Sequence, residues 1–264
     1  MVLLTALMGL AQSVAVLAIF ALAGVVIGRV GRQITQKNKE QWREYRLQRF
    51  WLINMLSAPV IIVIFFISAR VTGLSLTETG LNLNHLSISL LIAVPTSLIL
   101  GTISAISSYI AVKEGIKPIE IALDGGIFDA VGIILYAAIF VGPLEEFIFR
   151  GVIQALLMKD IGESLNIGPI HILYGTVIAA IIFVAYHYRN VMVGGETRKQ
   201  FLTMIPGRLT LSLFLSFLFQ GTGSLLGPIV FHNIIDTCTL ATLVVTTYQK
   251  NHAGLQNTAV KTEE

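Results

Sequence analysis

The hydropathy pattern divides the chain into long apolar runs that are separated by shorter polar stretches. The first two runs, 3–27 and 50–69, have the roughly 20 residues that a helix needs to cross a bilayer. Further apolar runs cover 88–112, 127–159, 170–186, 209–219 and 229–246. Only 12% of the residues are charged and 55% are hydrophobic, whereas soluble domains carry about 25% charged residues. The pattern predicts an all-α, polytopic membrane helix bundle.

The number of crossings depends on the run 127–159. At about 1.5 Å per residue this run would extend roughly 50 Å, which is too long for one straight crossing. A Gly-Pro pair at 142–143 interrupts it. If the chain turns back at Pro143, Glu145 and His187 lie near the same membrane face. If it crosses once with a bend, the basic loop after His187 is cytoplasmic, as charge bias prefers. We favour the first alternative and about eight helices.

The distribution of charged residues along the chain is typical of a membrane protein, and the small net charge argues against nucleic acid as a partner. The polar stretch 28–49 carries seven Lys or Arg residues against two Glu, an excess that is typical of a cytoplasmic loop. The net charge of +3 is too small to indicate nucleic-acid binding. We therefore expect a multi-pass protein of the cell (cytoplasmic) membrane, in contact with the lipid bilayer. Gly24 and Gly28 form a GxxxG motif, which is typical of helix packing.

The segment 142–151, GPLEEFIFRG, places two carboxylates and a guanidinium inside an apolar run. Ionisable groups inside a membrane cost several kcal/mol, so they are functional candidates. Glu146 and Arg150 are four residues apart on a helix and are predicted to pair. Glu145 points about 100° away from Glu146 around the axis, so it is free to act as a base. The alternative is that both glutamates serve a salt bridge between helices.

Two histidines occupy comparable positions in later apolar runs. His232 and Asp236 are four apart and project from one helical face, where the carboxylate could fix the ring through one nitrogen. His187 ends the run 170–186. Brought together with Glu145, these groups could activate water and stabilise an oxyanion, which is peptide hydrolysis without a covalent intermediate.

The same side chains would also suit a metal. Glu145, His187 and His232 form a workable zinc set. A water activated by glutamate alone and a water activated by zinc both fit this set, so no cofactor is predicted firmly and zinc is the one that these residue types would take.

Three motifs follow one another along the chain: EExxxR at 145–150, continued by Gly151, FxxxH at 183–187, and HxxxD at 232–236. In these motifs the chain resembles the CPBP family of intramembrane proteases, which includes the type II CAAX prenyl endopeptidases and the bacterial Abi, or bacteriocin-processing, proteins. The resemblance covers about 127–246. The first two crossings match that family only in general character.

The resemblance implies a role for each motif residue. Glu145 would activate water with help from His187, while Glu146 and Arg150 would brace the site. The substrate would be a membrane-embedded or lipidated peptide, such as a prenylated CAAX-type C-terminus.

The third motif departs from the family. His232 and Asp236 would form the oxyanion-stabilising pair, but the prenyl endopeptidases generally carry Asn at the second position. An ionised Asp accepts hydrogen bonds and donates none. We expect Asp236 either to orient His232 or to be protonated.

The resemblance also suggests a division of the chain. We expect N-terminal transmembrane helices over 1–112 with the basic loop 28–49, a CPBP-like catalytic helical core over 113–247, and a polar, frayed tail over 248–264.

Two other classes of function compete with the protease. A non-enzymatic protein, such as a bacteriocin-immunity or partner-binding factor, would keep its phenotype in Glu145→Gln and His187→Ala variants. A proton-coupled transporter would drive flux from a pH gradient, but the sequence lacks the internal repeat that many transporters show. We rank the endopeptidase first.

Overall fold

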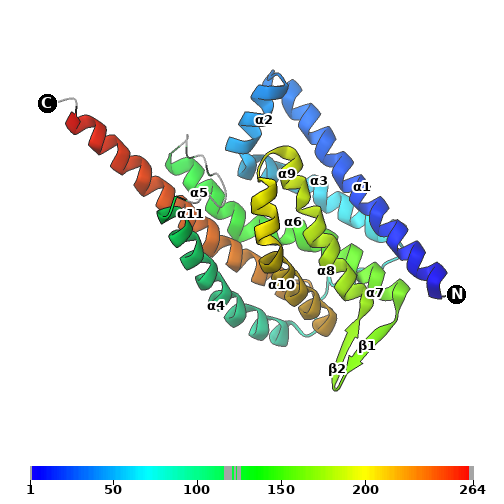
Figure 1. Cartoon of the computed structure of the whole chain (residues 1–264). Coiled ribbons are helices and arrows are strands. Elements are labelled where there is room, and N and C mark those ends of the chain that lie inside the picture. The colour runs from blue at the N-terminus through cyan, green and yellow to red at the C-terminus, as the bar shows by residue number, and fades with distance from the viewer. Residues whose placement is uncertain (1, 116–120, 122, 124–125, 262–264) are drawn as a thin grey trace.

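The computed structural model describes residues 2–115, 121, 123 and 126–261 and is nearly all helical (Figure 1). Its helices are α1 Val2–Thr35, α2 Lys39–Gln48, α3 Phe50–Val71, α4 Leu86–Lys113, α5 Ile127–Leu135, α6 Val141–Ile148, α7 Ala155–Ile161, α8 Tyr174–Tyr186, α9 Tyr188–Val193, α10 Arg198–Thr222 and α11 Leu226–Lys261. Two π-helical segments, η1 Tyr136–Phe140 and η2 Phe149–Gln154, connect α5, α6 and α7. One antiparallel hairpin, β1 Ser164–Ile167 with β2 Ile170–Leu173, is the sheet of the described part. The predicted all-α class is confirmed.

Seven helical stretches in the described residues are long and apolar enough to cross a bilayer. They are Leu4–Thr35, Phe50–Val71, Leu86–Lys113, Ile127–Ile161, Tyr174–Val193, Arg198–Thr222 and Leu226–Gln249. Each corresponds to one predicted apolar run, so the chain is a multi-pass membrane protein. With α5 to α7 taken as one helix and α8 with α9 as another, the eighth helix of the described part is the short polar α2.

The prediction that the chain turns back at Pro143 is wrong. Helical structure continues from Ile127 to Ile161, with π turns on both sides of α6. Proline has no N–H, and its ring clashes with the carbonyl four residues earlier. The wider π turn η1 directly before α6 accommodates this clash without ending the helix. At 35 residues the segment exceeds the thickness of a bilayer core, so it tilts or its ends project beyond the hydrocarbon.

Seven crossings place two of the connecting segments on one side of the membrane. The loop between α1 and α3 follows the first crossing and the short segment 194–197 follows the fifth, so both lie on the same side of the membrane. In Figure 1, α2 and α9 lie at the same end of the molecule.

Helix α10 begins earlier than its apolar run suggests. A capping box starts it: the hydroxyl of Thr197 accepts a hydrogen bond from the backbone N–H of Gln200, and the Gln200 side chain accepts one from the N–H of Thr197. The helix therefore starts at Arg198, within the stretch that the sequence suggested was a polar loop. Over the described residues, α11 continues to Lys261.

Helices α6 and α11 approach closely at Gly142. The backbone N–H of Gly142 donates to the Asn233 side-chain oxygen over 2.7 Å. A Cβ at position 142 would lie 2.6 Å from both that oxygen and the backbone oxygen of Ile229. Glycine is therefore required for this approach, which brings Glu146 on α6 next to His232 on α11.

Candidate active site

A cavity of about 430 Å³ opens between α1, α3, α6, α9 and α11. Most of the lining side chains are apolar, and the polar ones include Asn54, Ser57, Tyr136, Glu145, Tyr186, His187, Arg189, Asn190 and Asp236. The predicted polar cavity is therefore present. Glu145, His187 and Asp236 come together in its wall although they lie on three different helical segments.

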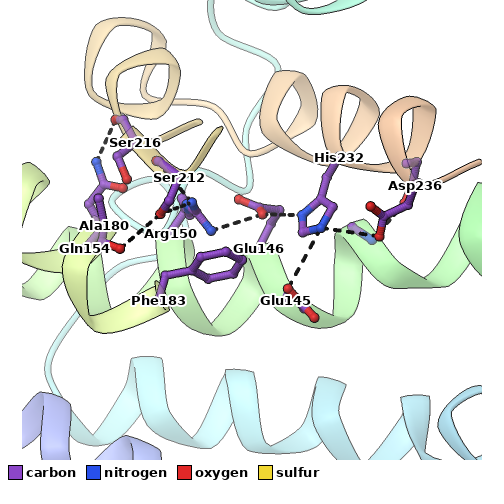
Figure 2. A network of polar contacts seen from close by, with 12 residues as sticks. Glu145, Glu146, Arg150, Gln154, Ala180, Phe183, Ser212, Ser216, His232 and Asp236 are labelled. Atoms are coloured by element: carbon purple, nitrogen blue, oxygen red, sulfur yellow. Dashed lines mark hydrogen bonds and ion pairs between the residues drawn. The ribbon is translucent and has the colours of Figure 1, made fainter. Parts of the chain in front are cut away.

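Glu146 and Arg150 form the buried part of the site (Figure 2). Their side chains are 0% and 1% exposed, and Arg150 Nη1 donates to Glu146 Oε1 over 3.1 Å. The predicted pairing is confirmed. His232 Nδ1 lies 2.7 Å from the same carboxylate oxygen. Because a carboxylate only accepts, this contact assigns a proton to Nδ1 and fixes the orientation of the ring.

The other side of Arg150 is held by residues from two further helices. Its Nη2 donates to the hydroxyl of Ser212 over 3.0 Å and to the backbone oxygen of the same residue over 3.2 Å. The Phe183 ring centroid lies 4.3 Å from the guanidinium carbon, within cation–π range. Ser212 in turn donates to the backbone oxygen of Ala180 over 3.2 Å. This buried cation thus has a partner on each side, as a charge removed from water requires.

Glu145 has different surroundings from its neighbour. Its side chain is 33% exposed, and its Oε2 lies 3.8 Å from His232 Nε2, beyond hydrogen-bond range. Among the described residues this oxygen has no hydrogen-bond partner. Glu146 Oε2 also lacks a partner among the described residues, but its side chain is fully buried, so the carboxylate that lines the cavity is that of Glu145.

Asp236 holds His232 less closely than expected. Its Oδ2 lies 3.6 Å from Nε2, whereas Glu146 takes the hydrogen bond to Nδ1. The carboxylate that fixes the ring therefore comes from the first motif rather than the third. Asp236 is 32% exposed and lies toward the cavity.

His187 ends α8 at the cavity wall. Its Nδ1 lies 2.9 Å from the backbone oxygen of Phe183, one turn earlier. A carbonyl accepts only, so Nδ1 carries a proton and Nε2 is the ring nitrogen left to face other groups. The spacing of the FxxxH motif thus has a physical reason, because its Phe supplies both the carbonyl for His187 and the ring that stacks on Arg150.

No three His, Cys, Asp or Glu side chains in the described part of the chain converge as metal ligands do. The predicted zinc set of Glu145, His187 and His232 is therefore not assembled in this arrangement.

Sequence analysis did not identify Ser212, which lies 62 residues from Arg150, or the pair formed by Asn54 and Tyr136. Asn54 donates to the Tyr136 hydroxyl over 3.1 Å in the cavity wall. Serine, asparagine and tyrosine inside apolar helices are common, so their positions along the chain carry no signal of these contacts. The FxxxH motif includes Phe183, but it gives no indication that Phe183 contacts Arg150.

These observations define a class: a multi-pass membrane protein in which a buried Glu–Arg–His network borders an intramembrane cavity. Residues 127–238, which carry all three motifs, match the family described as Rce1-like, type II CAAX prenyl endopeptidase Rce1-like. The predicted resemblance is thereby confirmed over this segment, and the family implies protease activity. No curated protein and no solved structure matches the chain.

Proposed function

We propose that this protein is an intramembrane endopeptidase that uses a glutamate-activated water to cut a membrane-anchored, lipidated peptide. The family match favours a prenylated CAAX-type C-terminus as the substrate. One observation carries the proposal. The Glu145 carboxylate lines a cavity together with His187, has an oxygen without a hydrogen-bond partner among the described residues, and lies 3.8 Å from His232 Nε2.

In the proposed reaction, Glu145 takes one proton from a water molecule while the His187 Nε2 lone pair accepts a hydrogen bond from the other O–H. The water oxygen forms a bond to the carbonyl carbon of the peptide, and the carbonyl oxygen becomes an oxyanion. His232, protonated on both nitrogens at this step, donates its Nε2–H to that oxyanion. The C–N bond then breaks, and Glu145 returns its proton to the leaving amine.

The remaining motif residues position these groups. Glu146 holds His232 Nδ1, and Arg150 holds Glu146 in turn. We assign Asp236 an orienting role toward the Nε2 side of the ring, because an ionised carboxylate has no proton to donate to an oxyanion. The catalytic core is proposed to be 113–247, in the cell membrane with the stretch 28–49 on the cytoplasmic side.

The test is cleavage of a fluorogenic prenylated peptide by the purified protein in liposomes. Glu145→Gln keeps the shape of the side chain and removes the base, so the rate should fall by roughly 10²- to 10⁴-fold. The exposed Glu163→Gln serves as the matched control and should cleave at the wild-type rate. Cleavage that persists in Glu145→Gln would reject the mechanism, and absence of cleavage by the wild type would favour a non-enzymatic role.

A further inference from the structure

A groove of about 470 Å³ lies where α1 ends and α2 begins. In Figure 1 these two helices meet at one end of the molecule. Within the described chain, the charged residues that line the groove are all cations: Arg29, Arg32, Lys37 and Lys39. The other lining residues carry side-chain amides: Gln33, Gln36 and Asn38. Guanidinium, ammonium and amide groups all supply N–H donors, so the groove is suited to an anion.

None of the four cations has an anionic partner within the described chain. No ion pair there joins any of them to a carboxylate, although Glu40 follows Lys39 directly. Lys37 is half-buried, and its Nζ lies 5.1 Å from the centre of the Tyr45 ring, in a cation–π contact. Like charges around one groove repel one another, and a bound anion would offset this repulsion.

The corner between the two helices is held by packing and by backbone hydrogen bonds. Trp42 on α2 is 8% exposed, and a Cβ at Gly31 on α1 would clash with its ring, so the helices touch here. Gln36 takes the left-handed conformation with φ 53°, and the Lys37 N–H donates to the Arg32 backbone oxygen over 3.2 Å, a pattern that ends many helices. The fold itself therefore builds the groove.

The groove lies at the surface of the membrane. Arg29 and Arg32 belong to the last two turns of the crossing Leu4–Thr35, whose 32 residues extend roughly 48 Å. The hydrocarbon core is about 30 Å thick. Because cations are costly inside hydrocarbon, the excess length lies at the charged end of this helix. The end of α1 therefore projects into the layer of lipid head groups, where phosphate groups lie.

We propose that this groove binds a phosphate-bearing anion, and that its position favours the head group of an anionic phospholipid. Arginine and lysine are the residues that bind phosphate groups in proteins, and basic pockets beside transmembrane helices bind anionic head groups. The site is separate from the cavity of Glu145, since none of the described residues that line the groove also lines that cavity. It does not depend on the proposed protease activity.

The test measures binding of fluorescent phosphatidylglycerol and phosphatidylcholine to the purified protein in detergent, by fluorescence anisotropy. The wild type should bind the anionic lipid about 10-fold or more tightly than the zwitterionic one, and added salt should weaken this binding. The double variant Arg29→Gln/Lys39→Gln removes two exposed cations and should weaken binding of phosphatidylglycerol by roughly 10- to 30-fold. Gln33→Glu keeps all four cations, places a carboxylate in the groove, and should weaken the same binding.

Arg198→Gln/Lys199→Gln is the matched control. It also removes one arginine and one lysine, both exposed, at the start of α10, which begins on the same side of the membrane as the groove. It should bind phosphatidylglycerol like the wild type. An equal loss of affinity in this control would show that surface charge alone attracts the lipid, and would overturn the inference. Unchanged affinity in Arg29→Gln/Lys39→Gln would overturn it as well.

Inorganic phosphate distinguishes the two sources of such an anion. Binding of phosphate alone to the wild type, weakened in Arg29→Gln/Lys39→Gln, would support the groove as a site for soluble phosphate compounds. Lipid binding that phosphate displaces no better than sodium chloride of equal ionic strength would support the lipid head group. Absence of both kinds of binding would reject the site.

Discussion

Glu145 and Glu146 are neighbours in the chain, yet their carboxylates differ in burial and in hydrogen-bond partners. Glu146 is fully buried and shares one oxygen between Arg150 and His232, whereas Glu145 is one-third exposed to the cavity. The 100° rotation between consecutive helical residues is enough to separate them. A chemical role and a bracing role can thus be assigned to adjacent identical side chains.

Loss of the buried Glu146 carboxylate should destabilise the protein far more than loss of the partly exposed Glu145 carboxylate. In Glu146→Gln, Arg150 keeps its charge inside the protein without a counter-charge, which costs about 3 kcal/mol. Chemical unfolding of the purified variants in detergent measures this difference. Glu145→Gln should unfold at nearly the wild-type midpoint, and equal midpoints for the two variants would contradict the assigned roles.

Two serines one turn apart on α10 provide a matched comparison. The Ser212 hydroxyl accepts from Arg150 and donates to Ala180, whereas the Ser216 hydroxyl has no hydrogen-bond partner among the described residues. Ser212→Ala should cost about 1–3 kcal/mol because a charged donor loses a partner. Ser216→Ala should be neutral or slightly stabilising, since it removes a buried hydroxyl that makes no bond. Thermal unfolding of both variants measures this difference in stability. An effect of the same size in each would show that the hydrogen bond between Ser212 and Arg150 does not contribute to stability.

At the scale of the helices, the site depends on how closely α6 lies against α11. Gly142 permits this approach, and the π turns before and after α6 keep the long helix continuous around Pro143. π-helical segments are frequent at functional sites because they change which side chains face a neighbour. Here they flank the eight residues that present both glutamates.

A methyl group at position 142 should therefore force the two helices apart. In Gly142→Ala the new Cβ would meet the backbone oxygen of Ile229, which cannot rotate away, so the variant should lose about 1–3 kcal/mol of stability. Cleavage should fall as well, because Glu146 and His232 separate. Gly207→Ala is the control: no atom lies within 4 Å of its would-be Cβ, and alanine is the better helix former by up to about 1 kcal/mol. A wild-type melting temperature and rate in Gly142→Ala would refute the argument.

At the scale of the whole molecule, a surface ion pair connects segments far apart in the chain. Lys159 at the end of α7 donates to Glu78 in the loop after α3 over 2.9 Å. The Ser75 backbone N–H, and then Lys159, lower the pKa of the Glu78 carboxyl from its ordinary value of 4.5 to about 2. The folded protein therefore favours the ionised form.

This shift gives a pH dependence with a defined sign. The contribution of Glu78 to stability should be complete above its unfolded pKa and should be lost as the pH falls from about 4.5 toward 2. The difference in melting temperature between wild type and Glu78→Gln should be constant from pH 8 to 6 and shrink between pH 4.5 and 3. The effect is small, because both side chains are more than 40% exposed and solvent screens the pair. A difference that grows on acidification would show that Glu78 is not held in its ionised form.

Much of the architecture could be predicted from sequence because membrane crossings are a local property. The apolar runs 50–69 and 88–112 became helices of nearly the same extent, since a backbone in lipid must satisfy its hydrogen bonds within the segment. The prediction of a break at Pro143 was wrong because a π turn accommodates the proline within a continuous helix. Such a π turn has no clear signal in the sequence. The start of α10 was missed although the Thr197–Gln200 capping box was present in the sequence.

By itself, the sequence determined the helical class, the pairing of Glu146 with Arg150, and the three motifs, because these depend on composition and on residues within one or two helical turns. Only the tertiary structure decided that Glu146 rather than Asp236 holds His232, and that Ser212, Phe183 and Arg189 surround the site. The contact between Glu146 and His232 joins residues 86 positions apart. Its geometry follows from the distance between α6 and α11, which the packing at Gly142 sets and no local pattern of residues specifies.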